Sequence, residues 1–151
     1  FNQFTGEKIT YEDPFEAEAK ILNSNYKKNY ENLGIISGDD KMTHLQTADI
    51  FLTASYSEGF SRSLLEAMAV GKPAVYTPVG AHREVYKSGV HGFSFVPGQL
   101  DQLKIALRKL LLDEKKRYEI GNTNRQHVVS NFSIKKISID FKTIITKTLA
   151  S

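Results

Sequence analysis

The sequence contains no cysteine and no tryptophan, only 4 prolines, and no long apolar run. The lack of cysteine excludes disulfides, thiol nucleophiles and thiolate zinc sites. His44, His82, His91 and His127 are scattered, without the short spacing of a metal-binding cluster. No stretch approaches the ~20 apolar residues that span a bilayer, and we expect no secretory leader at the start. These absences fit a cytoplasmic protein in a reducing compartment.

The chain also has little excess charge of either sign. The chain has 20 basic and 17 acidic side chains, a surplus of +3, which is too small to indicate a nucleic-acid binder. Basic residues do gather in the last third of the chain, and two interpretations are open. They form solvated helix faces, or they form a patch that faces anionic lipid. The residues concerned are Arg108, Lys109, Lys115, Lys116, Arg117, Lys135 and Lys136.

The length of 151 residues and the 40% hydrophobic content predict one globular domain with a core of its own. Residues 1–4 read like the end of a strand, so we expect the chain to be a fragment or an excised domain. Asp13 and Pro14 form a helix-start signal, which predicts a helix over 14–30.

Apolar runs then alternate with helical segments. We expect strands at 33–37, 49–53, 73–77 and 92–96, with helices at 41–47, 63–70 and 82–88 between them. Continuous apolar runs of this kind indicate an α/β fold, with a Rossmann-like parallel sheet covered by helices on both faces. From residue 100 onward the pattern is helical. Two apolar stripes there are expected to face the core: Leu100, Leu103, Leu107 and Leu110, then Ile134, Ile137, Phe141, Ile144 and Thr148.

In such sheets, ligands bind beyond the carboxyl ends of the strands, which directs attention to the loops at 37–40, 54–62 and 78–83. The middle loop immediately precedes a helix, whose first amides and dipole attract phosphate. Gly59 permits close approach, Ser61 and Ser63 add hydroxyl groups, and the guanidinium of Arg62 suits a phosphoryl oxygen. The alternative is that Ser61 only caps the helix and Arg62 only points into solvent.

Two glutamates flank that helix start. The carboxylate of Glu58 is an acceptor that suits sugar hydroxyls. Glu66 lies about two helical turns further on, where an acidic side chain suits the two hydroxyls of a ribose. The alternative for both is an ordinary solvated carboxylate.

Residues 58–75 resemble the E-x7-E signature of retaining glycosyltransferases of the GT-B type, glycosyltransferase family 4. The flanking segments resemble the same family: Ala48–Leu52 as the strand before the signature, Pro78–Val85 as the loop after it, and Gly89–Gly98 as the stretch that leads into the next strand. Together these segments cover most of residues 32–112.

The resemblance implies a role for each matching residue. Glu58 acts in catalysis and contacts the donor sugar, while Glu66 holds the ribose. The donor sugar and diphosphate are bound by Gly59, Phe60, Ser61 and Arg62, and the nucleobase lies against Ile36, Ser37 and Lys41. The substrate is a nucleotide diphosphate sugar, and neither a metal ion nor another cofactor is expected.

The resemblance also implies that residues 1–151 form the donor-binding C-terminal domain of a two-domain hexosyltransferase, incomplete at its N-terminus. The acceptor-binding domain is then absent, so the fragment alone is expected to be inactive. The expected acceptor is a glycan or lipid-linked molecule in polysaccharide biosynthesis, with the enzyme peripheral at the inner face of the membrane. Two alternatives remain: a non-catalytic binding or interaction module of the same fold and, less favoured, a sugar-nucleotide epimerase domain.

Overall fold

The computed structural model describes residues 31 and 33–149, and the chain divides into two compact units, 1–37 and 38–151. In the first unit, residues 33–37 form neither helix nor strand, so the strand predicted there is wrong. Gly34 has a φ of +60°, in the left-handed region that interrupts extended backbone, and the Ile35 side chain is fully exposed. The helix predicted over 14–30 and the strand end predicted at 1–4 lie outside the described residues.

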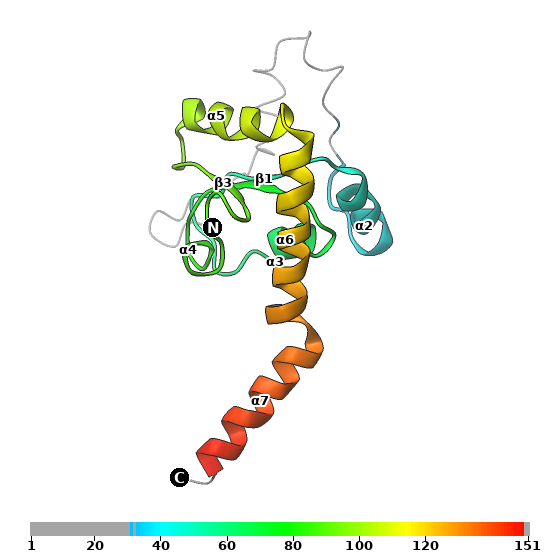
Figure 1. Ribbon diagram of the computed structural model, residues 1–151, viewed down its shortest axis with the longest axis vertical. Helices are drawn as coiled ribbons and strands as arrows, with labels where there is room; N and C mark the ends of the chain where they lie inside the picture. Colours follow the sequence, from blue (N-terminus) through cyan, green and yellow to red (C-terminus); the bar gives the residue numbers. More distant parts are fainter. Residues whose placement is uncertain (1–30, 32, 150–151) are drawn as a thin grey trace, which may run out of the picture. The chain divides into compact units, whose positions relative to one another are not determined.

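The second unit confirms the predicted α/β alternation (Figure 1). Its first elements are α2 Gly38–Thr47, β1 Phe51–Thr53, α3 Arg62–Ala69, β2 Ala74–Tyr76, α4 His82–Val85 and β3 Gly92–Ser94. The three strands form a parallel sheet in the order β1-β2-β3. Gly71, with a φ of +78°, ends α3 where the sequence predicts a helix stop.

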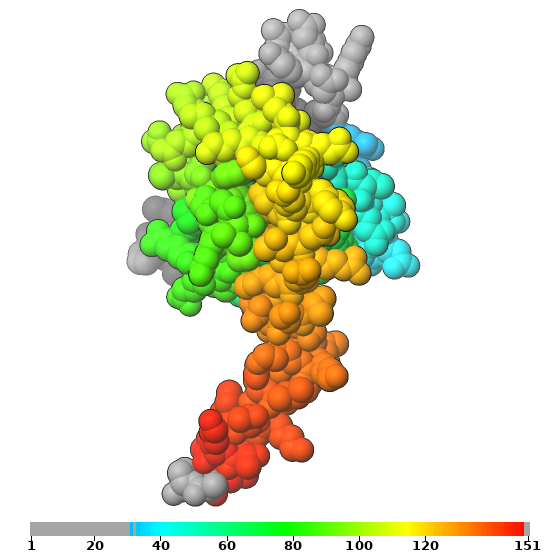
Figure 2. Space-filling view, in the orientation of Figure 1, coloured from blue at the N-terminus to red at the C-terminus, as the bar shows by residue number. Residues whose placement is uncertain are grey.

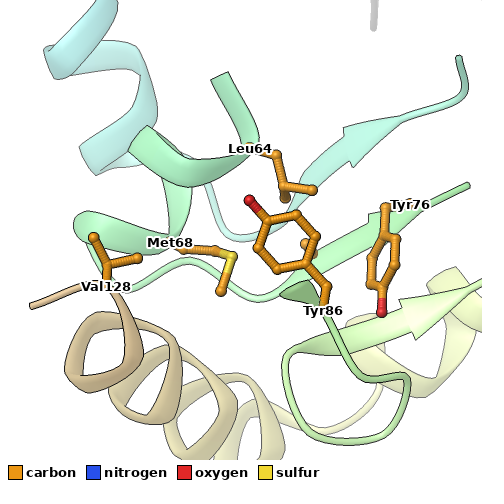
Figure 3. Packing of buried hydrophobic residues seen from close by; sticks show 6 residues of the cluster. Leu64, Met68, Tyr76, Tyr86 and Val128 are labelled. Atoms are coloured by element: carbon orange, nitrogen blue, oxygen red, sulfur yellow. The ribbon is translucent and has the colours of Figure 1, made fainter. Parts of the chain in front are cut away.

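Strand β2 lies at the centre of the core, because apolar side chains cover both of its faces. Ala74 and Tyr76 face one apolar cluster and Val75 the other. The first cluster is drawn in Figure 3 and is completed by Leu64, Met68, Tyr86 and Val128 from α3, the segment after α4, and α6. The second cluster is completed by Phe95, Ala106, Leu110 and Ile120. Helices therefore lie on both faces of the sheet, as predicted.

Three helices end the chain: α5 Leu100–Leu111, α6 Glu114–Phe132 and α7 Ile134–Leu149. The first predicted stripe is confirmed in part, since Leu110 is fully buried and Leu103 and Leu107 pack beside it, whereas Leu100 is 66% exposed. No helix in the described part of the chain is long and apolar enough to cross a membrane.

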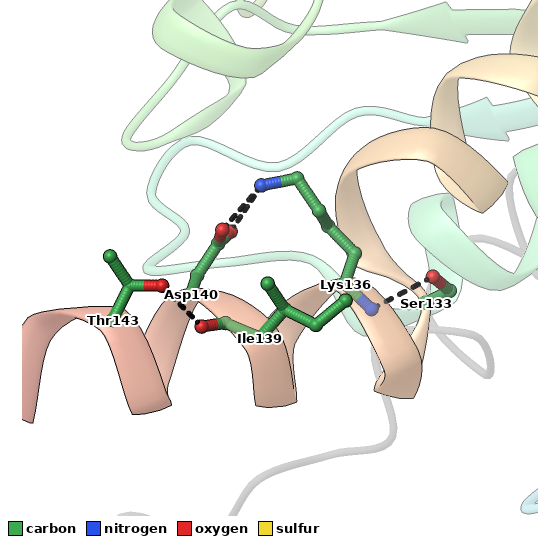
Figure 4. A network of polar contacts seen from close by, with 5 residues as sticks. All are labelled: Ser133, Lys136, Ile139, Asp140 and Thr143. Atoms are coloured by element: carbon green, nitrogen blue, oxygen red, sulfur yellow. Dashed lines mark hydrogen bonds and ion pairs between the residues drawn. The ribbon is translucent and has the colours of Figure 1, made fainter.

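The second predicted stripe, on α7, is wrong. No residue of α7 is buried in the described structure, and Phe141 is 65% exposed. The helix continues past the end of α6, away from the strands (Figures 1 and 2). Its polar contacts are local: Lys136 pairs with Asp140, and the Thr143 hydroxyl donates to the Ile139 carbonyl (Figure 4). The apolar spacing predicted a helix correctly, but spacing does not state what will cover the apolar face.

Candidate functional site

The loops that follow β1 and β2 lie side by side at the carboxyl ends of these strands. The Thr77 hydroxyl donates to the Ser55 carbonyl at 2.6 Å, and the Ala81 amide donates to the Gly59 carbonyl at 3.1 Å. These contacts bring together two of the three loops to which the strand pattern directs attention. This is the edge at which open parallel sheets bind ligands.

Gly80 allows the two loops to touch. Its φ is +52°, and a Cβ atom added there would lie 1.7 Å from the Glu58 carbonyl oxygen. A side chain would therefore force the loops apart. The backbone of Glu58 is thus seated directly against the loop after β2.

The Glu58 side chain is half-buried and has a fixed partner. The Ser55 hydroxyl donates to Glu58 Oε1 at 2.9 Å, and Thr53 Oγ1 lies 3.4 Å from the same hydroxyl oxygen. A carboxylate held in this way presents its remaining acceptor sites in a defined direction. Glu58 is therefore not a freely rotating surface side chain.

Ser61 caps α3, which was the plainer of its two interpretations. Its hydroxyl accepts from the Leu64 amide at 3.4 Å, and the residue is 4% exposed. Arg62 is exposed and has no ion pair within residues 38–149. In the same part of the chain, the amides of Gly59, Phe60 and Ser61 donate to no protein acceptor. The segment thus offers donors at the positive end of a helix.

Glu66 forms an ion pair that the sequence pattern does not predict. Lys41 Nζ, on α2, lies 2.8 Å from Glu66 Oε2, and the two side chains are 32% and 28% exposed. The resemblance implies a place for Lys41 at the nucleobase, which stays a prediction; in the structure its ammonium group contacts the carboxylate expected to hold the ribose. The two remaining nucleobase candidates belong to the first unit, where Ile36 is half-buried and Ser37 exposed.

A continuous row of rings runs from strand β2 to the segment before α3. This aromatic row consists of Tyr76, His82, Tyr86, His91, His127, Phe132 and Phe60, each ring within 6.2 Å of the next. Only Phe60, which is 42% exposed and precedes α3, belongs to the expected donor-binding segment. Sequence spacing could not reveal the row, because its members come from distant segments.

Burial shifts the pKa of several rings in this row. His82 is fully buried, and its Nδ1 lies 2.9 Å from the Thr77 carbonyl, so that nitrogen carries a proton. Burial lowers the pKa of His91 to about 4, with further lowering from His127 and Lys87. Burial also raises the pKa of Tyr76 to about 12. His91 and Tyr76 are therefore uncharged at neutral pH.

Acidic and histidine side chains form no metal-binding group in the described part of the chain. Across residues 31 and 33–149, no group of three or more His, Asp and Glu side chains is arranged to hold a metal ion. The chemistry that the described site offers is hydrogen bonding: two oriented carboxylates, with backbone amides and a helix N-terminus between them in the chain.

Comparison with known proteins gives several relatives. The chain is 34% identical over 100 residues to N-acetyl-alpha-D-glucosaminyl L-malate synthase of Bacillus anthracis, covering 66% of this chain and 26% of the relative. It is 26% identical over 121 residues to the capsular polysaccharide biosynthesis glycosyltransferase CapM of Staphylococcus aureus, covering 78% of this chain and 32% of that protein. The chain thus spans about a quarter to a third of the length of these curated relatives.

Solved structures share the fold. The C-terminal domain of the glycosyl transferase group 1 protein LpcC from Francisella tularensis matches with a TM-score of 0.70 and 28% identity, over 80% of this chain and 63% of that one. Anabaena Alr3699/HepE in complex with UDP-glucose matches with a TM-score of 0.77 and 23% identity, over 89% of this chain and 36% of that one. The second likeness is one of fold alone.

The family described as Glycosyl transferases group 1 matches residues 8–127, which is most of the chain. The parallel sheet, the helices on both of its faces and the loops at its carboxyl edge agree with that match. The chain belongs to the Glycosyl transferases group 1 family and has the fold of a GT-B glycosyltransferase domain.

Proposed function

We propose that this chain is the nucleotide-sugar-binding domain of a retaining glycosyltransferase of glycosyltransferase family 4. It binds a nucleotide diphosphate sugar and delivers the hexosyl group to an acceptor held by another domain of a longer protein. The share of its relatives' length that the chain spans supports this division of labour. Because acceptor and donor must be brought together for reaction, the chain by itself does not turn over.

One observation carries the proposal: the loop of Glu58 and helix α3, which bears Glu66, follow the carboxyl end of β1 directly, with donor amides between the two glutamates. Glu58 accepts hydrogen bonds from the donor sugar, and Glu66 accepts them from the ribose. The sugar and the ribose of the donor thereby each have a matching carboxylate. A nucleobase role for Ile36, Ser37 and Lys41 stays a prediction from the resemblance.

The diphosphate binds between the two glutamates. The amides of Gly59, Phe60 and Ser61 and the positive end of α3 face it, and the exposed Arg62 guanidinium contacts a phosphoryl oxygen. As the bond to the sugar breaks, negative charge develops on the leaving diphosphate. Fixed dipoles and cations stabilise that charge in the transition state, so the step requires no metal ion.

The biological setting we propose is glycan or polysaccharide synthesis in the cytoplasm, at the inner face of the membrane. Relatives such as CapM carry a capsular polysaccharide name. Helix α7 has an exposed apolar face and four lysines against one aspartate, a composition that suits an anionic lipid surface. Co-sedimentation with vesicles that contain phosphatidylglycerol, compared with pure phosphatidylcholine vesicles, tests this setting. Equal binding to both, or none to either, would contradict it.

Donor binding is tested by calorimetric titration with UDP-, GDP- and ADP-sugars. We expect one class of donor to bind, and Glu66→Ala to abolish that binding. Glu119→Ala is the matched control, because Glu119 is an exposed glutamate whose ion-pair partner, Lys115, lies on the same helix α6. If no donor of the panel binds, the chain is a non-catalytic module of the same fold. Sugar transfer by the chain alone, detected by product mass spectrometry, would contradict the proposed need for a second domain.

A further inference from the structure

Glu58 is oriented by a serine whose own position depends on the next loop. The Ser55 hydroxyl has one proton, and it is donated to Glu58 Oε1 at 2.9 Å. The Thr53 hydroxyl, 3.4 Å away, therefore acts as the donor to Ser55. The hydrogen bonds thus run from Thr53 through Ser55 to the carboxylate, and they fix the direction of the Glu58 side chain.

Thr77 fixes the backbone of that serine. Its hydroxyl donates to the Ser55 carbonyl at 2.6 Å, and its side chain is fully buried. Its amide donates to the Thr53 carbonyl at 3.2 Å, while its own carbonyl accepts from His82 Nδ1 at 2.9 Å. All the polar groups of Thr77 are thus engaged, and a buried hydroxyl held in this way does not rotate to another partner.

A second contact at the backbone joins the same two loops. Gly80 lies against the Glu58 carbonyl so closely that a Cβ atom cannot be accommodated, and the Ala81 amide binds the Gly59 carbonyl at 3.1 Å. The loop after β2 therefore determines both where the Glu58 backbone lies and, through Thr77 and Ser55, where the Glu58 carboxylate points.

We propose that Ser55 and Thr77 are positioning residues that set the direction of the Glu58 carboxylate toward the donor sugar. This inference rests on the proposed function, in which Glu58 faces the sugar. Precise orientation of an acceptor raises affinity for a hydroxyl pattern only when supporting groups hold it in place. The loop after β2 thereby contributes to sugar selectivity without touching the sugar.

The test compares the affinity for a sugar nucleotide with the affinity for the nucleoside diphosphate alone. Calorimetry measures the affinity of wild type, Ser55→Ala and Thr77→Val for UDP-glucose, GDP-mannose and ADP-glucose, and for UDP, GDP and ADP. We expect both variants to bind the preferred sugar nucleotide about tenfold more weakly, the effect of one lost charge-assisted hydrogen bond, and the matching diphosphate less than about twofold more weakly. Ser55→Thr and Thr77→Ser keep the hydroxyl and should restore affinity for the sugar nucleotide. Thr143→Val, on exposed α7, is the control and should bind both ligands as wild type does.

Two further variants test whether Ser55 acts on sugar-nucleotide affinity through Glu58. Glu58→Gln should lose at least as much affinity for the sugar nucleotide, and Ser55→Ala with Glu58→Gln should lose no more than Glu58→Gln alone. Equal losses for sugar nucleotide and diphosphate, or additive losses in the double variant, would overturn the positioning role. Wild type that binds no donor, or Glu58→Gln that binds like wild type, would instead overturn the proposed function and this inference with it.

Discussion

Replacing the buried Asn124 should destabilise the fold strongly. Asn124, on α6, is fully buried, and its Nδ2 donates to the Lys72 carbonyl at 2.8 Å and to the His91 carbonyl at 3.0 Å. Lys72 and His91 lie just before β2 and β3, so the Asn124 side chain links helix α6 to the starts of both strands. The two acceptors also fix which end of the amide carries nitrogen.

The expected loss follows from those two bonds. Each hydrogen bond contributes about 0.5–1.5 kcal/mol, and a buried carbonyl left without a donor costs about 1–3 kcal/mol. Asn124→Ala should therefore lower the free energy of unfolding by about 2–4 kcal/mol. Urea unfolding followed by far-ultraviolet circular dichroism should show a midpoint lower by about 1–2 M.

Two matched variants sharpen the result. Asn122→Ala changes an exposed asparagine of the same helix and should shift the free energy of unfolding by less than about 0.5 kcal/mol. Asn124→Asp keeps the size but turns an acceptor toward two carbonyls, so it should destabilise more than alanine does. If Asn124→Ala and Asn122→Ala unfold at the same urea concentration, the bridging role is refuted.

Three further predictions concern pH, charge and backbone. Because burial holds the pKa of His91 at about 4, the unfolded chain, whose histidine titrates near 6.5, takes up the proton first. Stability should therefore fall as the pH drops from 6.5 to 4, by at most about 1.4 kcal/mol per pH unit, and His91→Gln should reduce the pH dependence of the urea midpoint. Lys41→Met removes a partly exposed ion pair and should change the free energy of unfolding by less than about 1 kcal/mol; a larger loss in urea titration would contradict this. Gly80→Ala should lower it by more than about 2 kcal/mol, whereas Gly59→Ala, where an added Cβ meets nothing within 4 Å, should not.

The sequence predicts the elements that have local signals. Gly71 and Pro73 mark the passage from α3 to β2, and the apolar run at 73–77 becomes a buried strand. The helix start predicted after Glu58 is also found, with Glu58 in the loop before α3 and Glu66 on that helix. These features depend on residues close in the chain, where propensity and capping decide the outcome.

Features that depend on distant residues could not be predicted. The pairing of Lys41 with Glu66 and the bond from Thr77 to Ser55 require knowledge of which loops meet. The apolar stripe of α7 has the spacing of a buried helix, yet its side chains are exposed. At 33–37 the apolar residues read as a strand, but the left-handed backbone of Gly34 prevents it. Tertiary contacts decide the two pairings and the exposure of α7, whereas a local backbone conformation decides the outcome at 33–37.

The aromatic row allows ligand binding at the site to be followed by fluorescence. Because the chain contains no tryptophan, Phe60→Trp would introduce a lone indole at the exposed end of the row, against Phe132 and within the segment proposed to hold the donor. Its emission would respond to any ligand that excludes water from that ring. A titration could then be read by fluorescence, with no dye attached and no background from another indole.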